Sequence, residues 1–395
     1  MAGMPATRKR WRVVAAAIAI ALATAWWLLW PDVTSAALLL DLVDPGSRIR
    51  AVLPVRVAAV RESDIAVPTR HGEVEGRLHI PDAAANRTLL IVPGVHAGGI
   101  HEPRLAALAR RVAGAGATVL TLPLPDLRTY RITPESTDQI EDAITWLSSR
   151  KDLAPTGRVG VIGVSFAGGL ALVAAGRPGM RERLTAVVSL GGHADLPRAM
   201  AYACTGRLPD GSIRTPHDYG VVLALRAAIP RLVPPDQVAA LDRAVVTFLD
   251  ASSYATFDMT RGMALLAEAR QQEDALPEPA RTLMHYVNTR DVSPLGARVA
   301  PLVEALGGHP ALSPGRSPAT GAPVFILHGQ LDNVIPTPEA DRLVALLSGA
   351  GNTHVRTLVT PLVTHAAMQS DFAWADAWRL VRFWTKTWKQ LATVS

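Results

Sequence analysis

The sequence predicts an α/β fold: a mainly parallel twisted sheet with helices on both faces, a helical cap insertion and an N-terminal transmembrane helix. Three observations carry this prediction. Short β-branched segments alternate with helical patterns in the first half of the chain and again near its end, which is typical of parallel sheets. Residues 196–320 offer helical patterns and no convincing strand. An unbroken apolar run stands near the N-terminus.

Composition excludes several classes of protein. The net charge of +6 is local, because Arg8, Lys9, Arg10 and Arg12 supply four of the 40 basic residues and the other 36 nearly balance 34 acidic ones. No basic stripe with interleaved aromatic residues follows, so no nucleic-acid partner is expected. The single cysteine, Cys204, excludes an intramolecular disulfide and a cysteine-based metal centre.

The first element along the chain is the apolar run Val13–Trp30, interrupted only by Thr24. As a helix it would span about 27 Å, close to the hydrocarbon core of a bilayer. We therefore expect residues 1–12 to be a basic cytoplasmic stub, 13–30 a single-pass signal anchor, and the main domain to lie outside the cytoplasm. A cleaved signal peptide, cut near Thr34-Ser35-Ala36, is the alternative and would give a secreted protein.

The first part of the predicted core covers residues 31–195. The apolar patch 36–43 either extends the membrane-associated region or packs onto this core. Two segments, Arg48–Pro68 and Val74–Pro81, alternate enough to predict an antiparallel pair of strands. Strands are then expected at 88–92, 117–122, 159–162 and 184–190, and helices at 105–112, 133–150 and from Ser165 to about 175.

The remaining chain divides into a helical cap insertion over residues 196–320 and a second part of the core over 321–395. Helices in the cap are expected at 219–232, 235–249, 256–271 and 280–287. In the second part of the core we expect strands at 324–327 and 354–358, and helices at 338–347 and 371–391. The cap is expected over the carboxyl edge of the sheet, where active sites of such sheets lie.

The string Gly163-Val164-Ser165-Phe166-Ala167 follows a buried strand and opens a helix of small residues. Such a sharp turn lifts a serine hydroxyl into the open at the start of a helix. The N–H of Phe166 then points to where a developing oxyanion can be held. This arrangement suits a nucleophile and favours an enzyme.

A nucleophilic serine needs a base, and the base needs an orienting acid. The strand at 324–327 leads into a glycine-containing loop that ends at Asp332, and the strand at 354–358 leads into a loop carrying His365. In a parallel sheet both loops share the edge of Ser165. The predicted triad is therefore Ser165, Asp332 and His365, with Asp126 and Asp195 as reserve acids.

These features resemble the α/β-hydrolase superfamily, and within it the dienelactone-hydrolase-like and related serine esterase branch. The resemblance covers about residues 60–195 and 320–392, and the helical block sits where the family inserts its cap. It implies the order nucleophile, acid, histidine. It also implies that the loop Val92–Gly99 supplies the second oxyanion N–H from Val95, with His96 as second choice. Apart from the resemblance, we expect His96 to line the mouth of the pocket rather than to bind a metal. In this family the turn that carries the nucleophile, called the nucleophile elbow, usually has the sequence Gly-x-Ser-x-Gly. Here Ala167 stands at its last position.

The predicted function is that of a membrane-anchored serine hydrolase that cleaves a carboxylic ester, or a thioester or amide, through an acyl-enzyme. A small-molecule or lipid-like acyl substrate and no cofactor are expected. An acyltransferase using the same triad is the alternative among enzymes, and a non-catalytic, membrane-tethered binding protein of the same fold is the alternative outside them. No metal is expected, because His96 and His101 lack a carboxylate or cysteine at ligand spacing.

Overall fold

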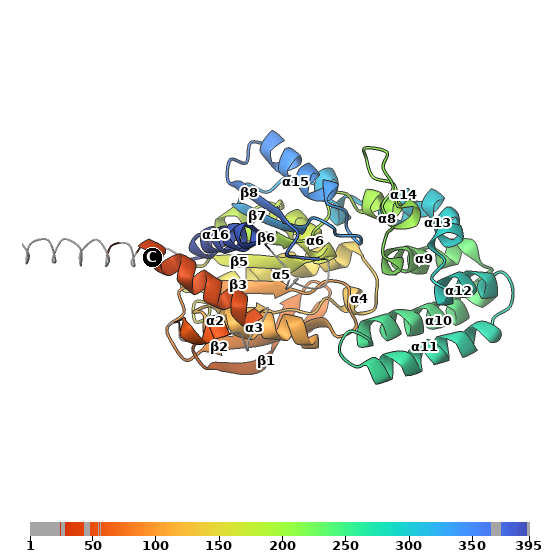
Figure 1. The fold of residues 1–395 in the computed structure, drawn as a ribbon, viewed down its shortest axis with the longest axis horizontal. Helices are drawn as coiled ribbons and strands as arrows, with labels where there is room; N and C mark the ends of the chain where they lie inside the picture. The colour runs from red at the N-terminus through yellow and green to blue at the C-terminus, as the bar shows by residue number, and fades with distance from the viewer. Residues whose placement is uncertain are drawn as a thin grey trace, which may run out of the picture.

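The computed structural model describes residue 24 and residues 28–42, 48–53, 55, 57–364 and 373–392. Figure 1 shows a central sheet with helices on both sides and a block of further helices beyond one end of the strands.

Eight strands form one sheet in the order β1-β2-β4-β3-β5-β6-β7-β8. β2 pairs antiparallel with β1 and β4, and from β4 to β8 along this order all pairs are parallel. The mainly parallel sheet predicted from the sequence is therefore confirmed. The strands are β1 (Val60–Thr69), β2 (Gly72–Pro81), β3 (Thr88–Val92), β4 (Thr118–Thr121), β5 (Val159–Val164), β6 (Leu184–Leu190), β7 (Val324–Gly329) and β8 (Val355–Thr360).

Helices cover both faces of this sheet, as predicted. Along β3, Leu89 and Ile91 belong to the apolar core shared with α3 and α16, whereas Leu90 and Val92 belong to the core shared with α5, α6 and α15. Successive side chains of a strand point to opposite faces, so each short buried strand contributes side chains to both apolar cores. The covering helices are α3 (Pro103–Gly114), α5 (Pro134–Ser149), α6 (Phe166–Ala175), α15 (Pro338–Gly349) and α16 (Trp374–Gln390).

Short helices lie in several connections, and one of them corrects the sequence prediction. The strand expected from Arg48 begins only at Val60, and residues 48–52 form the helix α2 instead. Arg50 of α2 pairs with the buried Asp41 of the preceding helical segment at 2.9 Å, a tertiary contact that the local pattern does not encode. The other short helices are η1 (Gly99–His101), α4 (Pro125–Arg128) and α7 (Met180–Arg183).

The prediction of an N-terminal transmembrane helix is wrong for the part of the chain that the structure describes. Among those residues, no helix is both long enough and apolar enough to cross a membrane. Residues 1–23 and 25–27, which include most of the predicted stub and span, lie outside the described residues.

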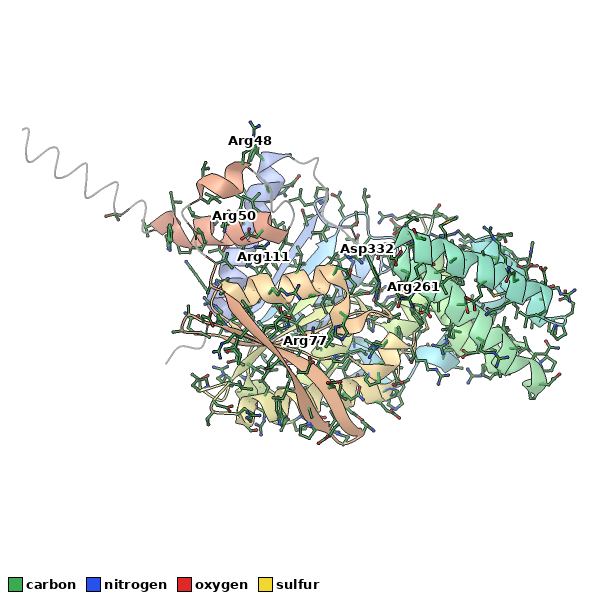
Figure 2. All side chains as sticks on the ribbon, turned by 90° about the horizontal axis from the view of Figure 1, so that it is seen from below. Arg48, Arg50, Arg77, Arg111, Arg261 and Asp332 are labelled. Carbon is green, nitrogen blue, oxygen red and sulfur yellow. The ribbon has the colours of Figure 1, made fainter. Side chains whose placement is uncertain are left out.

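The described helical residues 28–42 pack against the sheet domain. Leu38 is buried in the core beneath α3 and α16. Asp32 pairs with Arg382 of α16 at 3.2 Å, and Figure 2 shows Arg50 and Arg111 beside this segment. Of the two outcomes expected for the apolar patch 36–43, packing onto the core is therefore the one seen for its described residues, 36–42.

The block between β6 and β7 is helical, as predicted. Its helices α9, α10, α11 and α12 match the four expected ones to within a few residues, whereas α8, α13 and α14 were not predicted. Its elements are α8 (Leu196–Thr205), α9 (Asp218–Leu232), α10 (Pro235–Tyr254), α11 (Met259–Asp274), α12 (Ala280–Asn288), α13 (Val292–Val299), η2 (Ala300–Leu302), α14 (Val303–Gly307), η3 (Pro310–Leu312) and η4 (Pro314–Arg316).

Candidate active site

Ser165 stands between β5 and α6 in a strained backbone conformation, with φ of 56° and ψ of −132°. A positive φ in a residue with a side chain costs on the order of 1–3 kcal/mol and persists only where the surroundings enforce it. They do so here: the Ser165 N–H donates to the Leu190 carbonyl at 2.7 Å, and its own carbonyl accepts from the Gly168 N–H at 2.8 Å. This is the strand–turn–helix geometry predicted for a nucleophile elbow.

Two glycines make room for this turn. A Cβ on Gly163 would lie 2.4 Å from the Ala167 carbonyl oxygen, which no real side chain tolerates. A Cβ on Gly94, in the loop after β3, would lie 2.9 Å from the Ser165 Cβ. The loop after β3 therefore lies directly against the serine.

Ala167 replaces the usual glycine of the elbow without disturbing it. Its side chain is fully buried in the core on the α6 face of the sheet. The close approach of the helix to the sheet occurs at the next residue, Gly168, where a Cβ would lie 2.7 Å from the Ser189 Oγ. The methyl group of Ala167 therefore has a place in the core.

The two N–H groups predicted to hold an oxyanion belong to Phe166, which follows Ser165, and to Val95, which follows the Gly94 that packs against the serine. Phe166 is the first residue of α6, so its N–H has no acceptor within the helix and stands at the positive end of the helix dipole. Val95 follows Gly94 and is buried, with its carbonyl accepting a hydrogen bond from the Tyr219 hydroxyl at 2.8 Å. The cap helix α9 therefore contacts the loop that carries the second donor.

Tyr219 belongs to a polar cluster that sequence reasoning missed. Its ring meets the Tyr130 ring edge-on at 6.4 Å. The Tyr130 hydroxyl in turn donates to Asp250 Oδ1 at 2.8 Å and lies 2.9 Å from the Ser253 Oγ, both on α10. Burial raises the pKa of both tyrosines, so their hydroxyls stay protonated. Tyr219 and Val95 are 124 positions apart, and no local sequence pattern predicts their contact.

Asp332 is almost fully buried, with 1% of its surface exposed, three residues beyond the end of β7. Its Oδ1 accepts from the N–H groups of Val334 and Ile335 at 2.9 and 3.0 Å, which fixes the orientation of the carboxyl group. The His328 Nε2 is 3.7 Å from Oδ2 and 2.8 Å from the Ile335 carbonyl. In Figure 2, Asp332 lies on the side of the sheet domain that faces the cap.

His365 lies outside the described residues. The chain just before it returns from β8 to the carboxyl end of β7, because a Cβ on Gly329 would lie 2.4 Å from the Val363 carbonyl oxygen and 3.5 Å from the Thr364 Cα. The Gln330 N–H also donates to the Thr360 carbonyl at 2.9 Å. The approach to residue 365 therefore runs beside the loop of Asp332.

The two reserve acids each have a local partner. Asp126 accepts a hydrogen bond from the Thr133 hydroxyl. Asp195 caps α8 by accepting from the Arg198 N–H at 3.0 Å and pairs with Arg316 at 2.7 Å. Burial by itself would raise the pKa of Asp195, but these hydrogen bonds hold that pKa below its ordinary value.

His96 sits at the boundary between the core and the cap. Its Nδ1 accepts from the Gly98 N–H at 3.0 Å, and its ring lies 6.2 Å from the Phe257 ring, just after α10. Burial lowers the pKa of His96, which favours its neutral form. Among the residues that the structure describes, no group of three or more histidines, cysteines or carboxylates is arranged to hold a metal ion.

The chain is similar to several solved structures. The chain is similar to the solved structure of the rice cell wall degrading esterase LipA from Xanthomonas oryzae, with a TM-score of 0.53 and 15% identity, covering 87% of this chain and 95% of that one. It is also similar to a Pyrococcus furiosus esterase (TM-score 0.46, 13% identity, 83% and 91% covered). A third similar structure is a Pyrobaculum calidifontis esterase (TM-score 0.43, 16% identity, 85% and 82% covered).

No protein-family model and no curated protein matches the sequence. At 15% identity the likeness to the Xanthomonas enzyme concerns the fold. Together with the strand order and the elbow, it shows that this chain has the α/β-hydrolase fold, as the resemblance in the sequence implied.

Proposed function

We propose that this chain is a serine hydrolase that cleaves carboxylic esters. The observation that carries the proposal is Ser165, held at a positive φ at the start of α6, on the sheet edge where Asp332 also stands. Strained backbone conformations of this kind cluster at functional sites, where the position of a side chain matters. The solved Xanthomonas oryzae esterase of similar fold is consistent with this chemistry.

In the proposed mechanism, the Ser165 Oγ attacks the ester carbonyl while His365 accepts its proton. The C–O bond to the alcohol then breaks, and His365 gives that proton to the leaving alcohol. A water molecule then attacks the acyl carbonyl while His365 accepts its proton. The bond between the acyl carbon and the Ser165 Oγ breaks, and His365 returns the proton to that Oγ, which releases the acid and restores Ser165. The N–H groups of Phe166 and Val95 would hold the oxyanion, each being worth roughly 3–4 kcal/mol.

Asp332 suits the role of orienting acid because two backbone N–H groups hold its carboxyl group in one orientation. A buried carboxylate fixed in this way can select the tautomer of a histidine and stabilise its positive charge. The chain leading to His365 runs beside the Asp332 loop, which supports this assignment.

The test is hydrolysis of p-nitrophenyl esters by wild-type protein and three variants. Ser165→Ala removes the nucleophile and should lower kcat by about 10⁶-fold. Asp332→Asn should lower kcat by about 10⁴-fold, because the asparagine favours the wrong histidine tautomer. Ser149→Ala, on the exposed end of α5, is the matched control and should leave kcat unchanged.

Circular dichroism and the unfolding midpoint would establish that each variant is folded. Full activity in folded Ser165→Ala would contradict the proposal. Full activity in Asp332→Asn alone would transfer the acid role to Asp126 or Asp195.

A further inference from the structure

The solvent-facing side of α16 carries tryptophan and basic side chains together. On its other side, Phe383 and Trp384 are buried in the apolar core shared with the sheet, so the helix is amphipathic. At about 100° per residue, six exposed side chains fall within an arc of roughly 140° around the helix axis. These six residues form the α16 face: Trp374, Trp378, Arg379, Arg382, Lys386 and Lys389.

Both tryptophans of the α16 face are strongly exposed. Trp374 is 76% and Trp378 is 50% exposed, whereas Trp384 on the buried side is 4% exposed. The tryptophan side chain joins a large apolar ring to one polar N–H, so it is enriched where an apolar medium meets water. The α16 face therefore presents two groups that suit such an interface better than water alone.

The helical segment 28–42 extends this apolar surface. Arg382, one turn after Trp378, pairs with Asp32 at 3.2 Å. Leu28 and Leu29 lie about one turn before Asp32 and are 61% and 47% exposed. Exposed apolar side chains therefore stand within about one helical turn of the contact between the two helices, one set on each of them.

The α16 face is positively charged. Its four basic side chains stand against one carboxylate of α16, Asp376, which pairs with Arg379. Arg382 is balanced by its pairing with Asp32. The exposed Lys386 and Lys389 remain as an excess of positive charge, so the face is complementary to an anionic partner.

This combination favours a lipid surface over a protein partner. Lysine is depleted in protein–protein interfaces, whose buried centres avoid charge. A bilayer that contains anionic lipid accommodates both kinds of side chain, because tryptophan rings lie at the level of the headgroups and lysines are attracted to the negative surface. An amphipathic helix of this composition lies on a membrane and does not cross it.

We propose that the α16 face is a docking surface for a bilayer that contains anionic lipid. α16 lies along the membrane surface, with Trp374 and Trp378 among the headgroups and with Lys386 and Lys389 against the negative charge. This inference goes beyond the proposed ester hydrolysis and does not depend on it.

A fluorescent label on α16 of the full chain tests the docking directly. Cys204 is the one cysteine of the chain and is buried, so an introduced Ala375→Cys supplies an exposed thiol within the arc of the α16 face. The environment-sensitive dye NBD on this thiol should brighten and shift its emission to the blue when phosphatidylcholine vesicles containing phosphatidylglycerol are added. Ala345→Cys, exposed on α15 at the opposite face of the sheet, is the matched labelling control and should show no shift.

The apolar contribution is tested by changing both tryptophans in the chain labelled at position 375. Trp374→Ser together with Trp378→Ser should abolish the blue shift. Ile213→Ser, which changes an apolar side chain of the cap that is 71% exposed, is the control and should leave the shift intact.

The ionic contribution is tested by neutralising both lysines. Lys386→Gln together with Lys389→Gln should raise the vesicle concentration for half of the shift by about 30-fold, or roughly fivefold for each lysine near an anionic surface. Added salt should weaken binding of the parent protein in the same direction. Lys151→Gln, an exposed lysine away from α16, should leave the half-point unchanged.

The proposal is overturned if the label on α16 does not shift with vesicles, or if it shifts equally with pure phosphatidylcholine. A shift that survives the double tryptophan substitution would overturn it as well. A blue shift that grows with protein concentration in the absence of vesicles would assign the face to a second copy of this chain instead. None of these measurements involves ester turnover, so failure of the proposed hydrolase function would leave the result standing.

Discussion

Replacing Tyr219 by phenylalanine tests whether the cap positions the oxyanion loop. The substitution removes one hydroxyl, which donates to the Val95 carbonyl at 2.8 Å. Val95 is buried, with 7% of its surface exposed, so its carbonyl would lose a partner that water does not readily replace. The free energy of unfolding should fall by about 1–2 kcal/mol.

The larger effect should be on catalysis. The N–H of Val95 is the proposed second oxyanion donor, a contribution of roughly 3 kcal/mol. If the loop relaxes enough to lose about half of that contribution, kcat falls roughly 10-fold. KM should change little, because the interaction belongs to the transition state. Steady-state hydrolysis of a p-nitrophenyl ester measures both parameters.

Tyr130→Phe is the matched control. It removes a hydroxyl that contacts Asp250 and Ser253 in the same cluster, but it leaves the bond between Tyr219 and Val95 intact. Its unfolding free energy should fall by a similar amount while kcat stays within about threefold. If Tyr219→Phe loses stability but keeps its kcat within twofold, the hydroxyl is merely structural and does not position the Val95 N–H.

Three further predictions concern the elbow and pH. Gly163→Ala should lower kcat about 100-fold, because its Cβ would lie 2.4 Å from the Ala167 carbonyl oxygen and must displace the turn. Gly349→Ala meets nothing within 4 Å and should leave kcat unchanged; equal kcat values in the two variants would refute the steric argument. Ala167→Gly should keep kcat within about threefold and lower the unfolding free energy by about 1 kcal/mol, since a buried methyl group is lost; a large gain in kcat would show that Ala167 impairs the elbow. Burial lowers the pKa of His193, so below pH ~6.5 the unfolded chain binds a proton that the folded chain does not. Stability should therefore fall as pH drops below about 6.5, by up to ~1.4 kcal/mol per pH unit, and urea titrations of His193→Gln should show a shallower slope.

The sequence predicted the parts of the fold that depend on local patterns. The segments at 88–92 and 184–190 are short, β-branched and bounded by turn residues, and they form β3 and β6 with those bounds. The elbow was predictable for the same reason, because a strand, a tight turn and a helix of small residues follow one another within 17 positions of the chain.

Contacts between distant segments were not predictable in this way. Residues Arg48–Val52 form a helix, and its Arg50 pairs with the distant Asp41. The transmembrane helix was predicted from the hydropathy of the N-terminal segment alone. The bond from Tyr219 to Val95 arises only when the cap folds onto the sheet. Periodicity carries no information on which side chains meet across such a boundary.

The central claim is that Ser165 is an activated nucleophile, and covalent labelling tests it most directly. A fluorophosphonate reacts with a serine only where a base and an oxyanion site activate it. Intact mass spectrometry of the treated protein should show one adduct, which peptide mapping places on Ser165 and which is absent in Ser165→Ala. Folded wild-type protein that stays unlabelled, or a label on another serine, would contradict the account.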